Sequence, residues 1–439
     1  MKEDDQEQHS AEEIHAELQN GSLPEYDLED SSFLLPTKID RRGLSRMIND
    51  LLGLQTPVAF DILFNDEPLR TTLAEKLEEQ KIQSESTVKL VYTLAITEPE
   101  ETEVDNVNDW IAGIAFTQHA GYFATACYDG NITLYNATNI VKVMDFVTAN
   151  RSASAIALHS ASDMENNIEL VCGHMNGLLE VYCINTSAKK PTRALIATSQ
   201  SDTDTIEAIA IHMKGSFLAA AGNGNDIFVY DNLYTLLRSH DSDHVEPLLT
   251  LSRHKKTVMC IKFLQLAEPI LVSASIDWHI AIWDVAKGTL LSIYNCGKSL
   301  TCLDVSEDCS ELFTGHEEGT IGVWELRCKG DGAQPKAADD FSNCTLTPRV
   351  SASMFERSVM AVKVNPKNTN LLSAISLDGC SVLIDKRFVK IPLQSVTFKH
   401  QDDPDRGTAC CWVSAHEIVC TTASGSVRKL QFKELTSLE

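Results

Sequence analysis

From Trp110 to Gln431 the chain repeats one arrangement of apolar and polar positions seven times. Each unit has an alternating apolar run, a run of small residues, a polar turn and a second apolar run. The turn pairs are Asp129-Gly130, Asn176-Gly177, Gly224-Asn225, Asp277-Trp278, Glu318-Gly319, Asp378-Gly379 and Ser424-Gly425. Six residues after the first member of each pair stand the anchors Tyr135, Tyr182, Tyr230, Trp283, Trp324, Ile384 and Leu430, spaced by 47, 48, 53, 41, 60 and 46 residues. This period, with several short strands per unit, is typical of β-propeller blades.

The seven units predict that residues 109–439 form a seven-bladed WD-repeat propeller. Between anchors, several units hold a further segment that suits the outer strand of a blade. These segments are Val141–Val147, Arg193–Thr198, Leu248–Leu251 and Leu290–Tyr294. Two polar inserts, 233–247 and 329–350, interrupt the repeat, and we expect both to be surface loops.

The last unit is incomplete in the sequence. Only residues 431–439 follow its anchor, and they are too few for a turn and an outer strand. The segment 96–108 (ITEPEETEVDNVN) precedes the first unit and has the acidic composition of a linker. We predict that part of this segment forms the outer strand of the last blade and closes the ring, which removes an exposed sheet edge.

A different pattern in residues 11–95 predicts a separate small domain, whereas the charged residues 1–10 are expected to form a disordered acidic tail. Asp40 suits a helix N-cap, and apolar residues follow at helical spacing until Gly53. Apolar or alternating runs predict strands at 14–18, 33–35, 58–64 and 87–92. This order favours a β-grasp, the ubiquitin-like architecture, over a generic small α+β domain. The predicted fold class is mainly β, a seven-bladed β-propeller preceded by this α+β domain.

The fourth unit has the most complete WD-repeat pattern, with His254, Ser273, Asp277 and Trp283. In WD-repeat propellers these residue types form a buried hydrogen-bonded chain, because a buried indole N–H and a buried imidazole both need partners. We therefore interpret the four residues as a structural tetrad. Other units keep only parts of it.

Charge and cysteine usage narrow the range of partners. The formal net charge is −25, and residues 1–109 hold 26 acidic and 9 basic residues. Such a balance argues against a sequence-independent grip on phosphate backbones, so direct RNA contact is not expected. The first ten residues do not resemble a signal peptide, and no apolar run has the length of a membrane span. The 13 cysteines lack a C-x-x-C pair and are expected to be reduced thiols inside the cell.

Candidate catalytic chemistry is sparse. Gly222-Asn223-Gly224 lacks the spacing of a dinucleotide loop and fits a blade turn. Cys172 and His174 have no second pair at metal-ligand spacing, and no serine lies in a nucleophile elbow. We predict no catalytic residues, no cofactor of its own and no enzymatic activity. A propeller enzyme would need convergent acid–base or metal ligands at the central channel, which the pattern does not offer.

The combined pattern resembles the WD-repeat subunit of the PeBoW complex, a factor for large ribosomal subunit maturation. The resemblance rests on 44–52 (LSRMINDLL), 60–70 (FDILFNDEPLR), 82–92 (IQSESTVKLVY) and 109–114 (DWIAGI). It covers nearly the whole chain and is looser in the blades, many of which lack the Trp-Asp pair. The Notchless family shares this type of N-terminal domain but has eight blades, whereas this chain has seven units.

The resemblance implies a role for the polar loop before the last strand of the first domain. In these families the ubiquitin-like domain presents a glutamate to the metal-ion-dependent adhesion site of midasin, a large AAA ATPase. The matching residue is Glu85, flanked by Ser84 and Ser86 as partner-binding residues. Its carboxylate would complete the octahedral oxygen shell of a Mg²⁺ ion held by the partner. From composition alone, a loop glutamate is most simply a solvated residue.

The resemblance also implies the remaining partners and the location. The propeller would bind the block-of-proliferation WD-repeat subunit, which binds Pescadillo, and ATP-driven pulling would release the module from the pre-60S particle. The expected locations are the nucleolus and nucleoplasm, with nuclear entry alongside a partner because no clear basic import cluster is present. The alternative function is a substrate-recruiting WD-repeat scaffold in a ubiquitin pathway, which would not need the Glu85 carboxylate.

Overall fold

The computed structural model describes most of the chain, in segments. These are residues 13–21, 26–28, 30–54, 57–65, 67–81, 87–107, 109–117, 120–160, 167–187, 192–200, 205–231, 246–266, 268–327, 345–387, 389–390, 392–401, 403–433 and 435. Two compact units divide the chain: residues 1–97 with 433–439 form the first unit, and residues 98–432 form the second unit. The predicted tail at 1–10 lies outside the described residues.

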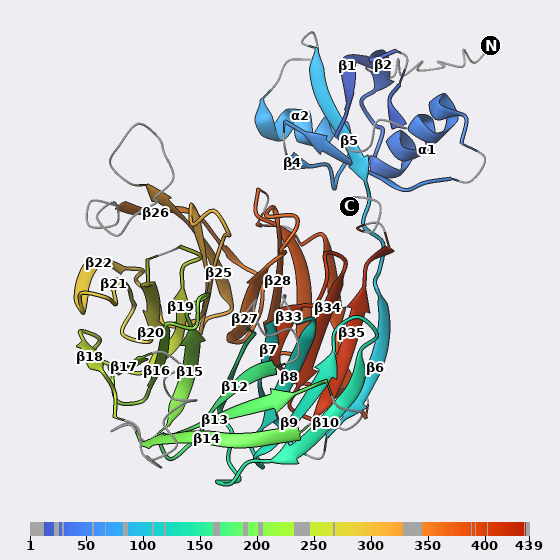
Figure 1. Cartoon of the computed structure of the whole chain (residues 1–439). Helices are drawn as coiled ribbons and strands as arrows, with labels where there is room; N and C mark the ends of the chain where they lie inside the picture. The colour runs from blue at the N-terminus through green and yellow to red at the C-terminus, as the bar shows by residue number, and fades with distance from the viewer. Residues whose placement is uncertain are drawn as a thin grey trace, which may run out of the picture. The chain divides into compact units, whose positions relative to one another are not determined.

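In its described part, the first unit contains one five-stranded sheet in the order β2-β1-β5-β3-β4 and two helices. The elements are β1 (Glu13–Asn20), β2 (Ser32–Pro36), α1 (Arg41–Leu52), β3 (Phe60–Phe64), β4 (Glu67–Pro68), α2 (Leu73–Gln80) and β5 (Val88–Leu94). β1 and β5 pair in parallel at the centre of the sheet, and the other pairs are antiparallel (Figure 1). This mixed sheet is the β-grasp arrangement that the sequence predicts.

Helix α1 begins and ends where its sequence indicates. The Asp40 carboxylate accepts a hydrogen bond from the Gly43 N–H at 2.8 Å, and Gly53 ends the helix with a φ of 63°. The buried face of α1 presents Leu44 and Ile48 to the sheet. Both ends of the helix are therefore fixed by local chemistry rather than by packing alone.

Helix α2 is a difference from the prediction, which had only a short connection before the last strand. Its N-cap is Thr72, whose hydroxyl accepts from the Glu75 N–H at 3.4 Å. Leu73 and Leu77 lie four residues apart and bury on one face. The Thr72–Glu75 spacing is that of a capping box, a helix signal that the strand pattern on both sides obscured.

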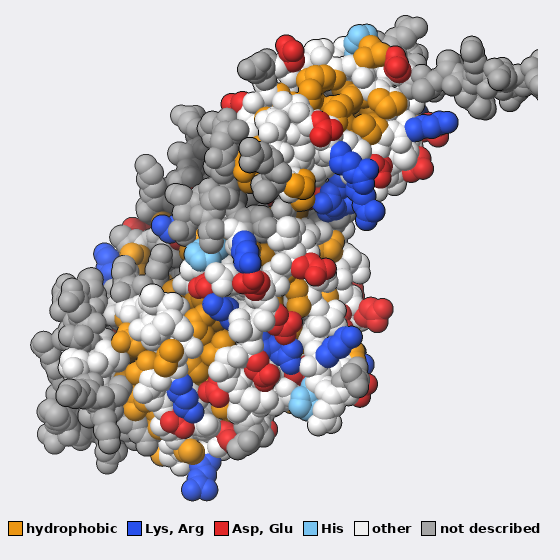
Figure 2. Space-filling model, turned by 90° about the vertical axis from the view of Figure 1, so that its right-hand side faces the viewer, with side chains coloured by type: hydrophobic (Ala, Val, Ile, Leu, Met, Phe, Trp, Pro, Cys, Tyr) orange, Lys and Arg blue, Asp and Glu red, His pale blue; other side chains and the backbone are white. Residues whose placement is uncertain are grey.

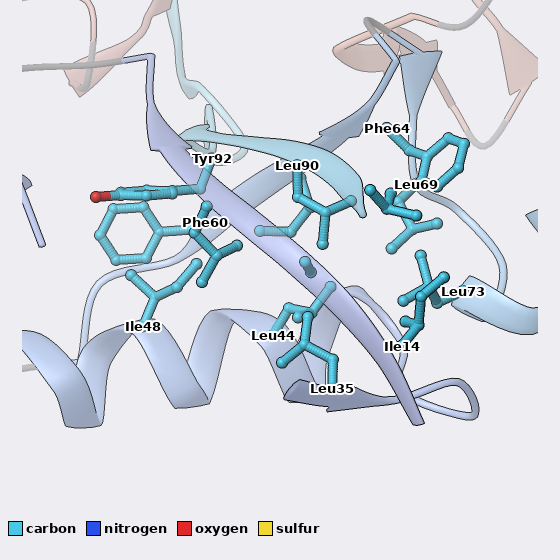
Figure 3. Packing of buried hydrophobic residues seen from close by; sticks show 14 of the residues in the cluster. Ile14, Leu35, Leu44, Ile48, Phe60, Phe64, Leu69, Leu73, Leu90 and Tyr92 are labelled. Atoms are coloured by element: carbon cyan, nitrogen blue, oxygen red, sulfur yellow. The ribbon is translucent and has the colours of Figure 1, made fainter. Parts of the chain in front are cut away.

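The core of the first unit lies between α1 and the sheet (Figure 3). Phe60 and Tyr92 pack edge to face with ring centroids 5.8 Å apart, and the Tyr92 hydroxyl donates to the Tyr26 carbonyl at 2.7 Å. Ile14, Leu44 and other fully buried aliphatic side chains complete the cluster. Each such side chain contributes about 1.5–3 kcal/mol of burial free energy, so β5 is held firmly in the middle of the unit.

The described part of the second unit contains seven four-stranded antiparallel sheets. Their strands are β6 (Glu100–Asn106), β7 (Ile111–Thr117), β8 (Tyr122–Cys127), β9 (Asn131–Asn136), β10 (Val141–Val147), β11 (Ala155–His159), β12 (Asn167–Gly173), β13 (Leu178–Asn185), β14 (Thr192–Gln200), β15 (Ile206–Ile211), β16 (Phe217–Gly222), β17 (Asp226–Asp231), β18 (Leu249–Ser252), β19 (Val258–Phe263), β20 (Ile270–Ser275), β21 (His279–Asp284), β22 (Thr289–Asn295), β23 (Leu300–Val305), β24 (Glu311–His316), β25 (Thr320–Arg327), β26 (Thr345–Ser353), β27 (Val359–Val364), β28 (Leu371–Ser376), β29 (Cys380–Asp385), β30 (Gln394–Thr397), β33 (Gly407–Trp412), β34 (Glu417–Thr422) and β35 (Ser426–Gln431). A small pair, β31 (Lys399–His400) and β32 (Asp403–Pro404), lies between the last two sheets in the chain.

The first strands of the seven sheets contact one another in a closed cycle. β7 contacts β11, and the contacts continue through β15, β19, β23, β27 and β33 back to β7. Each sheet thus packs between two others, which is the arrangement of blades in a propeller and is consistent with seven of them.

Strands are present in all four segments predicted as outer strands, and one predicted loop needs correction. β10, β14, β18 and β22 occupy the four segments proposed for outer strands. The loop predicted at 329–350 extends too far at its C-terminal end, because residues 345–350 belong to β26. The Thr-rich stretch at the start of β26 pairs with β25 and ends the fifth sheet. Most of the other insert, 233–247, lies outside the described residues, which resume at residue 246.

The last sheet takes its outer strand from the N-terminal side of the propeller. β6 pairs antiparallel with β35, so its order is β33-β34-β35-β6, and Figure 1 shows β6 alongside β35. β6 lies within 96–108, the segment predicted to supply this strand. The ring therefore closes by joining residues more than 300 positions apart in the chain.

Acidic side chains of β6 are used in specific contacts. The Arg428 guanidinium donates to Glu101 at 2.6 Å, and the Ser426 hydroxyl donates to Glu103 at 3.1 Å. Asp105 accepts a hydrogen bond at 2.8 Å from the buried Tyr135 hydroxyl of the first blade. The acidic residues that suggest a linker in the sequence therefore attach β6 to the last and first blades.

We expect Asp105→Ala to destabilise the protein by about 2 kcal/mol, because the buried Tyr135 hydroxyl loses its acceptor. Thr102→Ala, on the exposed side of the same strand, is the control and is expected to change stability by less than about 0.5 kcal/mol. The measurement is the free energy of unfolding in urea. If Tyr135→Phe adds its full cost on top of Asp105→Ala, the two side chains are not coupled and the interpretation is wrong.

Candidate partner-binding sites and buried networks

Glu85 lies in the chain between two described elements, helix α2 and strand β5. Helix α2 ends at Gln80, and its C-cap Lys81 has a φ of 54° and donates its N–H to the Glu78 carbonyl at 3.2 Å. On the other side, β5 begins at the buried Val88 between β1 and β3. Ser84, Glu85 and Ser86 themselves lie outside the described residues, so their assignment as partner-binding residues stays a prediction.

The surface of the first unit has both exposed hydrophobic and positively charged side chains. Leu34 on β2 is 50% exposed and Leu51 on α1 is 46% exposed. Figure 2 shows hydrophobic side chains gathered on the described surface of this unit, with Lys and Arg side chains in a neighbouring area. Surfaces of this composition are suited to protein contacts.

The four predicted tetrad residues lie together in the fourth blade. Ser273 is at the centre: its hydroxyl is 2.8 Å from His254 Nε2 and accepts the Trp283 indole N–H at 2.9 Å. His254 Nδ1 is 3.1 Å from the Asp277 carboxylate. Burial lowers the pKa of His254 although Asp277 opposes the shift, so the imidazole is neutral near pH 7. A neutral ring with its proton on Nδ1 donates to Asp277 and accepts from Ser273.

Asp277 also connects two loops. Its carboxylate accepts the Lys255 N–H at 2.8 Å and the His279 N–H at 3.0 Å. Burial works against its charge, but these N–H groups and His254 lower the pKa of Asp277 overall. The carboxylate is therefore ionised and holds the loop before β19 against the turn between β20 and β21.

Other blades contain similar buried hydrogen bonds made by different residues. In the fifth blade the Trp324 indole donates to Thr314 at 2.8 Å, and Thr314 is 3.1 Å from His316. Burial lowers the pKa of His316 to about 4, so this ring is neutral too. In the second blade the Tyr182 hydroxyl donates to Glu180 at 2.5 Å, next to His174 at 3.1 Å. The hydrogen-bonded pairing of an aromatic with a polar side chain persists where the Trp-Asp pair is lost.

The central channel contains charged side chains but has no catalytic arrangement among the described residues. A cavity of about 520 Å³ is lined by the first strands of all seven blades. Within it, Asp304 pairs with Lys262 and accepts the Val364 N–H at 2.8 Å. Burial opposes the charge on Asp304, but Lys262 and Lys363 lower its pKa, so it is not poised as a general acid. This group ties the fourth, fifth and sixth blades together.

The described residues contain neither a cluster of metal ligands nor an activated thiol. No three His, Cys, Asp or Glu side chains gather there as a metal site, and His174 near Cys172 is engaged by Glu180. The cysteines in this part are free, and burial raises the pKa of Cys127 to about 12. Such thiols are protonated and unreactive at neutral pH. No described helix is long and apolar enough to cross a bilayer.

We expect Ser273→Ala to lower the free energy of unfolding by about 3 kcal/mol, because it leaves His254 Nε2 and the Trp283 indole N–H without partners in a buried site. Ser252→Ala, on the exposed end of β18, removes the same hydroxyl from the surface and is expected to have little effect. Urea unfolding of both variants measures the difference. Equal stabilities would show that the tetrad does not stabilise this blade.

Glu169 on β12 predicts a pH dependence of stability. Its side chain is buried, and burial raises its pKa from 4.5 to about 7. The folded state therefore binds more protons than the unfolded state between these values, and its contribution to stability is lost as pH rises from 4.5 through 7. We expect Glu169→Gln to match the wild type near pH 4.5 and to exceed it by up to about 3 kcal/mol at pH 8. Urea unfolding at both pH values tests this, and parallel pH profiles would contradict it.

Comparisons with known proteins match both units. The family model of the NLE (NUC135) domain matches residues 14–77, and the model of the WD domain, G-beta repeat, matches residues 245–284. The second match contains the complete tetrad. The first ends before the loop at 82–86, so it does not extend to Glu85.

Several curated proteins resemble the chain along most of its length. A protein named ribosome biogenesis protein WDR12 homolog from Oryza sativa subsp. japonica is 23% identical over 85% of this chain and 86% of its own length. Its counterpart from Arabidopsis thaliana is 21% identical over 91% and 92%. Ribosome biogenesis protein YTM1 from Candida glabrata is 30% identical over 29% and 30%.

These relatives support a role in ribosome biogenesis, which implies a nuclear or nucleolar location. Their family is a non-enzymatic one with WD scaffold repeats, as the absence of catalytic motifs in the sequence predicts. The chain combines an NLE domain with WD repeats, and it is similar to ribosome biogenesis proteins named WDR12 homolog and Ytm1. These findings confirm the resemblance to the WD-repeat subunit of the PeBoW complex.

Proposed function

We propose that this protein bridges a PeBoW-type complex to the AAA ATPase midasin during maturation of the large ribosomal subunit. Its propeller binds the block-of-proliferation subunit, and through it Pescadillo. Its NLE unit presents Glu85 to the midasin adhesion site. ATP-driven pulling then releases the module from pre-60S particles in the nucleolus and nucleoplasm.

The observation that carries this proposal is the continuous path from the Glu85 loop to the ring closure. Three residues after Glu85 the chain enters β5, the central strand of the first unit. Six residues after the end of β5 it enters β6, the strand that closes the propeller through β35. A force applied at the loop therefore passes through one packed strand into the backbone ladder and the Arg428–Glu101 pair. Such a connection is suited to transmitting a pull to the whole propeller.

The chemistry of the chain fits a metal ligand supplied in trans. Mg²⁺ prefers an octahedral set of oxygen ligands, and an adhesion site with one open position accepts a carboxylate from another protein. The described residues of the first unit do not form a metal site of their own. The partner would therefore provide the other ligands, and Glu85 a single carboxylate.

The test is binding of the full-length protein to the isolated midasin adhesion-site domain, with Mg²⁺ and with EDTA. We expect Glu85→Ala to weaken binding about a hundredfold, because a charged partner of the ion is lost. Glu85→Asp is expected to weaken it less severely, since the carboxylate is one methylene shorter. Glu78→Ala, which removes an exposed carboxylate from α2, is the matched control and is expected to bind like the wild type.

The outcomes separate the proposed bridge from the alternative. Metal-dependent binding that Glu85→Ala loses and that Glu85→Asp weakens supports the bridge. If all variants bind alike, or if none binds, Glu85 is an ordinary surface residue. The ubiquitin-pathway scaffold, which does not need this carboxylate, then becomes the better account of the same two units.

A further inference from the structure

Each of the seven blades turns between its second and third strands through one residue with a positive φ. These residues are Gly130 (82°), Gly177 (79°), Asn225 (67°), Trp278 (74°), Gly319 (75°), Gly379 (81°) and Gly425 (87°). Glycine and asparagine adopt this conformation readily, whereas a bulky side chain is strained in it. Trp278 is therefore the exception among seven equivalent positions.

The glycines at these turns are required by close packing as well as by φ. A Cβ at Gly319 would lie 2.1 Å from the Phe355 carbonyl oxygen, and one at Gly425 would lie 1.9 Å from the Val107 carbonyl oxygen. The turn of the fourth blade accepts a side chain, but it does not bury that side chain, since Trp278 is 49% exposed. Neither backbone preference nor core packing accounts for tryptophan here. Uncompensated local strain of this kind is characteristic of functional positions.

The loop beside this turn is basic. Arg253, Lys255 and Lys256 are exposed on the loop between β18 and β19. The loop is fixed to the turn by the Lys255 N–H, which donates to Asp277 at 2.8 Å, and by the Ser275 hydroxyl, which donates to the Thr257 carbonyl at 2.8 Å. The loop that carries the three cations is therefore adjacent to the turn that carries the indole, and we call these four residues the Trp278 patch.

The charge of this patch is not neutralised within the described part of the chain. Where described carboxylates form ion pairs, their partners are other cations, and none of these pairs includes Arg253, Lys255 or Lys256. Asp277, the acid next to the indole, is buried and engaged by His254 and two backbone N–H groups. An unpaired cationic cluster around an exposed tryptophan is unusual on a chain of net charge −25.

We propose that the Trp278 patch docks an acidic peptide segment of a protein partner. An apolar side chain of the peptide packs on the indole, while its carboxylates pair with Arg253, Lys255 and Lys256. Aromatic and arginine side chains are the residue types that dominate binding energy at protein interfaces. The site lies on the propeller and does not include Glu85, so it stands whether or not the midasin bridge does.

The limited extent of the patch favours a peptide over single-stranded RNA. RNA binding without sequence preference uses a basic groove that follows the backbone and several stacking aromatics. Here the cations lie on one loop, and the equivalent turn of the next blade carries Glu317 and Glu318.

The test pans a phage library of random dodecapeptides against the full-length protein and measures binding of the selected peptides. We expect selected sequences rich in Asp and Glu with an apolar residue, and a loss of about thirtyfold or more in affinity for Trp278→Asn. The paired variant Lys255→Glu with Lys256→Glu is expected to lose binding as well. Leu248→Ala, 57% exposed at the opposite end of the third blade, is the control and should bind like the wild type.

Thermal unfolding distinguishes a docking residue from a structural one. Asparagine copies the residue of the third blade and tolerates positive φ, so Trp278→Asn is expected to keep or raise the Tm while binding is lost. A lower Tm would show that the indole stabilises the fold, and the proposal would fail. It would also fail if the selected peptides were not acidic, if none were selected, or if Trp278→Asn bound them normally. Tight binding of a poly(U) dodecamer that depends on Trp278 would assign the patch to RNA instead.

Discussion

The antiparallel pairing of β6 with β35 is the constraint on which the second unit depends. A propeller blade buries both of its faces only when it has a neighbour on each side, so every blade requires a closed ring. The cluster between the last and first blades shows this need, since Val419 and Val427 pack with Ile111 and Phe123 in one core. Without β6, the last sheet would keep an open edge beside this core. Closure therefore stabilises the first and last blades together.

The same strand explains why an acidic segment lies between the two units. In isolation the segment has the composition of a solvated linker, because charged residues favour water over a core. In the structure its carboxylates face Arg428, Ser426 and Tyr135, so the charges have specific partners at the ring closure. A neutral linker could pair its backbone with β35 but could not make these contacts. The link between the units is thus also a structural part of the propeller.

The sequence predicts those parts of the fold and of the candidate sites that are determined by residues adjacent in the chain. The turn pairs and anchors located the blades because the period is regular, and Asp40 and Gly53 located α1 because caps act through adjacent residues. Helix α2 was missed although Thr72 and Glu75 form a capping box, because the segment is short and lies between strand patterns. The strain at Trp278 was also missed: a turn pair can be recognised from its spacing, whereas the sign of φ at its second residue cannot. The Glu85 site came from family resemblance and rests on no local pattern at all.

The fourth blade joins the most complete buried network to the most unusual surface residue. Asp277, the residue before Trp278, accepts hydrogen bonds from the backbone N–H groups of Lys255 and His279. Because Asp277 is itself held by His254 and, through it, by Ser273, the turn rests on a chain of hydrogen bonds that reaches into the blade core. Binding residues are most effective when a rigid scaffold fixes them in advance, since little conformational entropy is then lost on association. The other blades, with partial networks, keep glycine or asparagine at this position. The blade with the firmest support is therefore the one that can hold an exposed tryptophan in a strained turn.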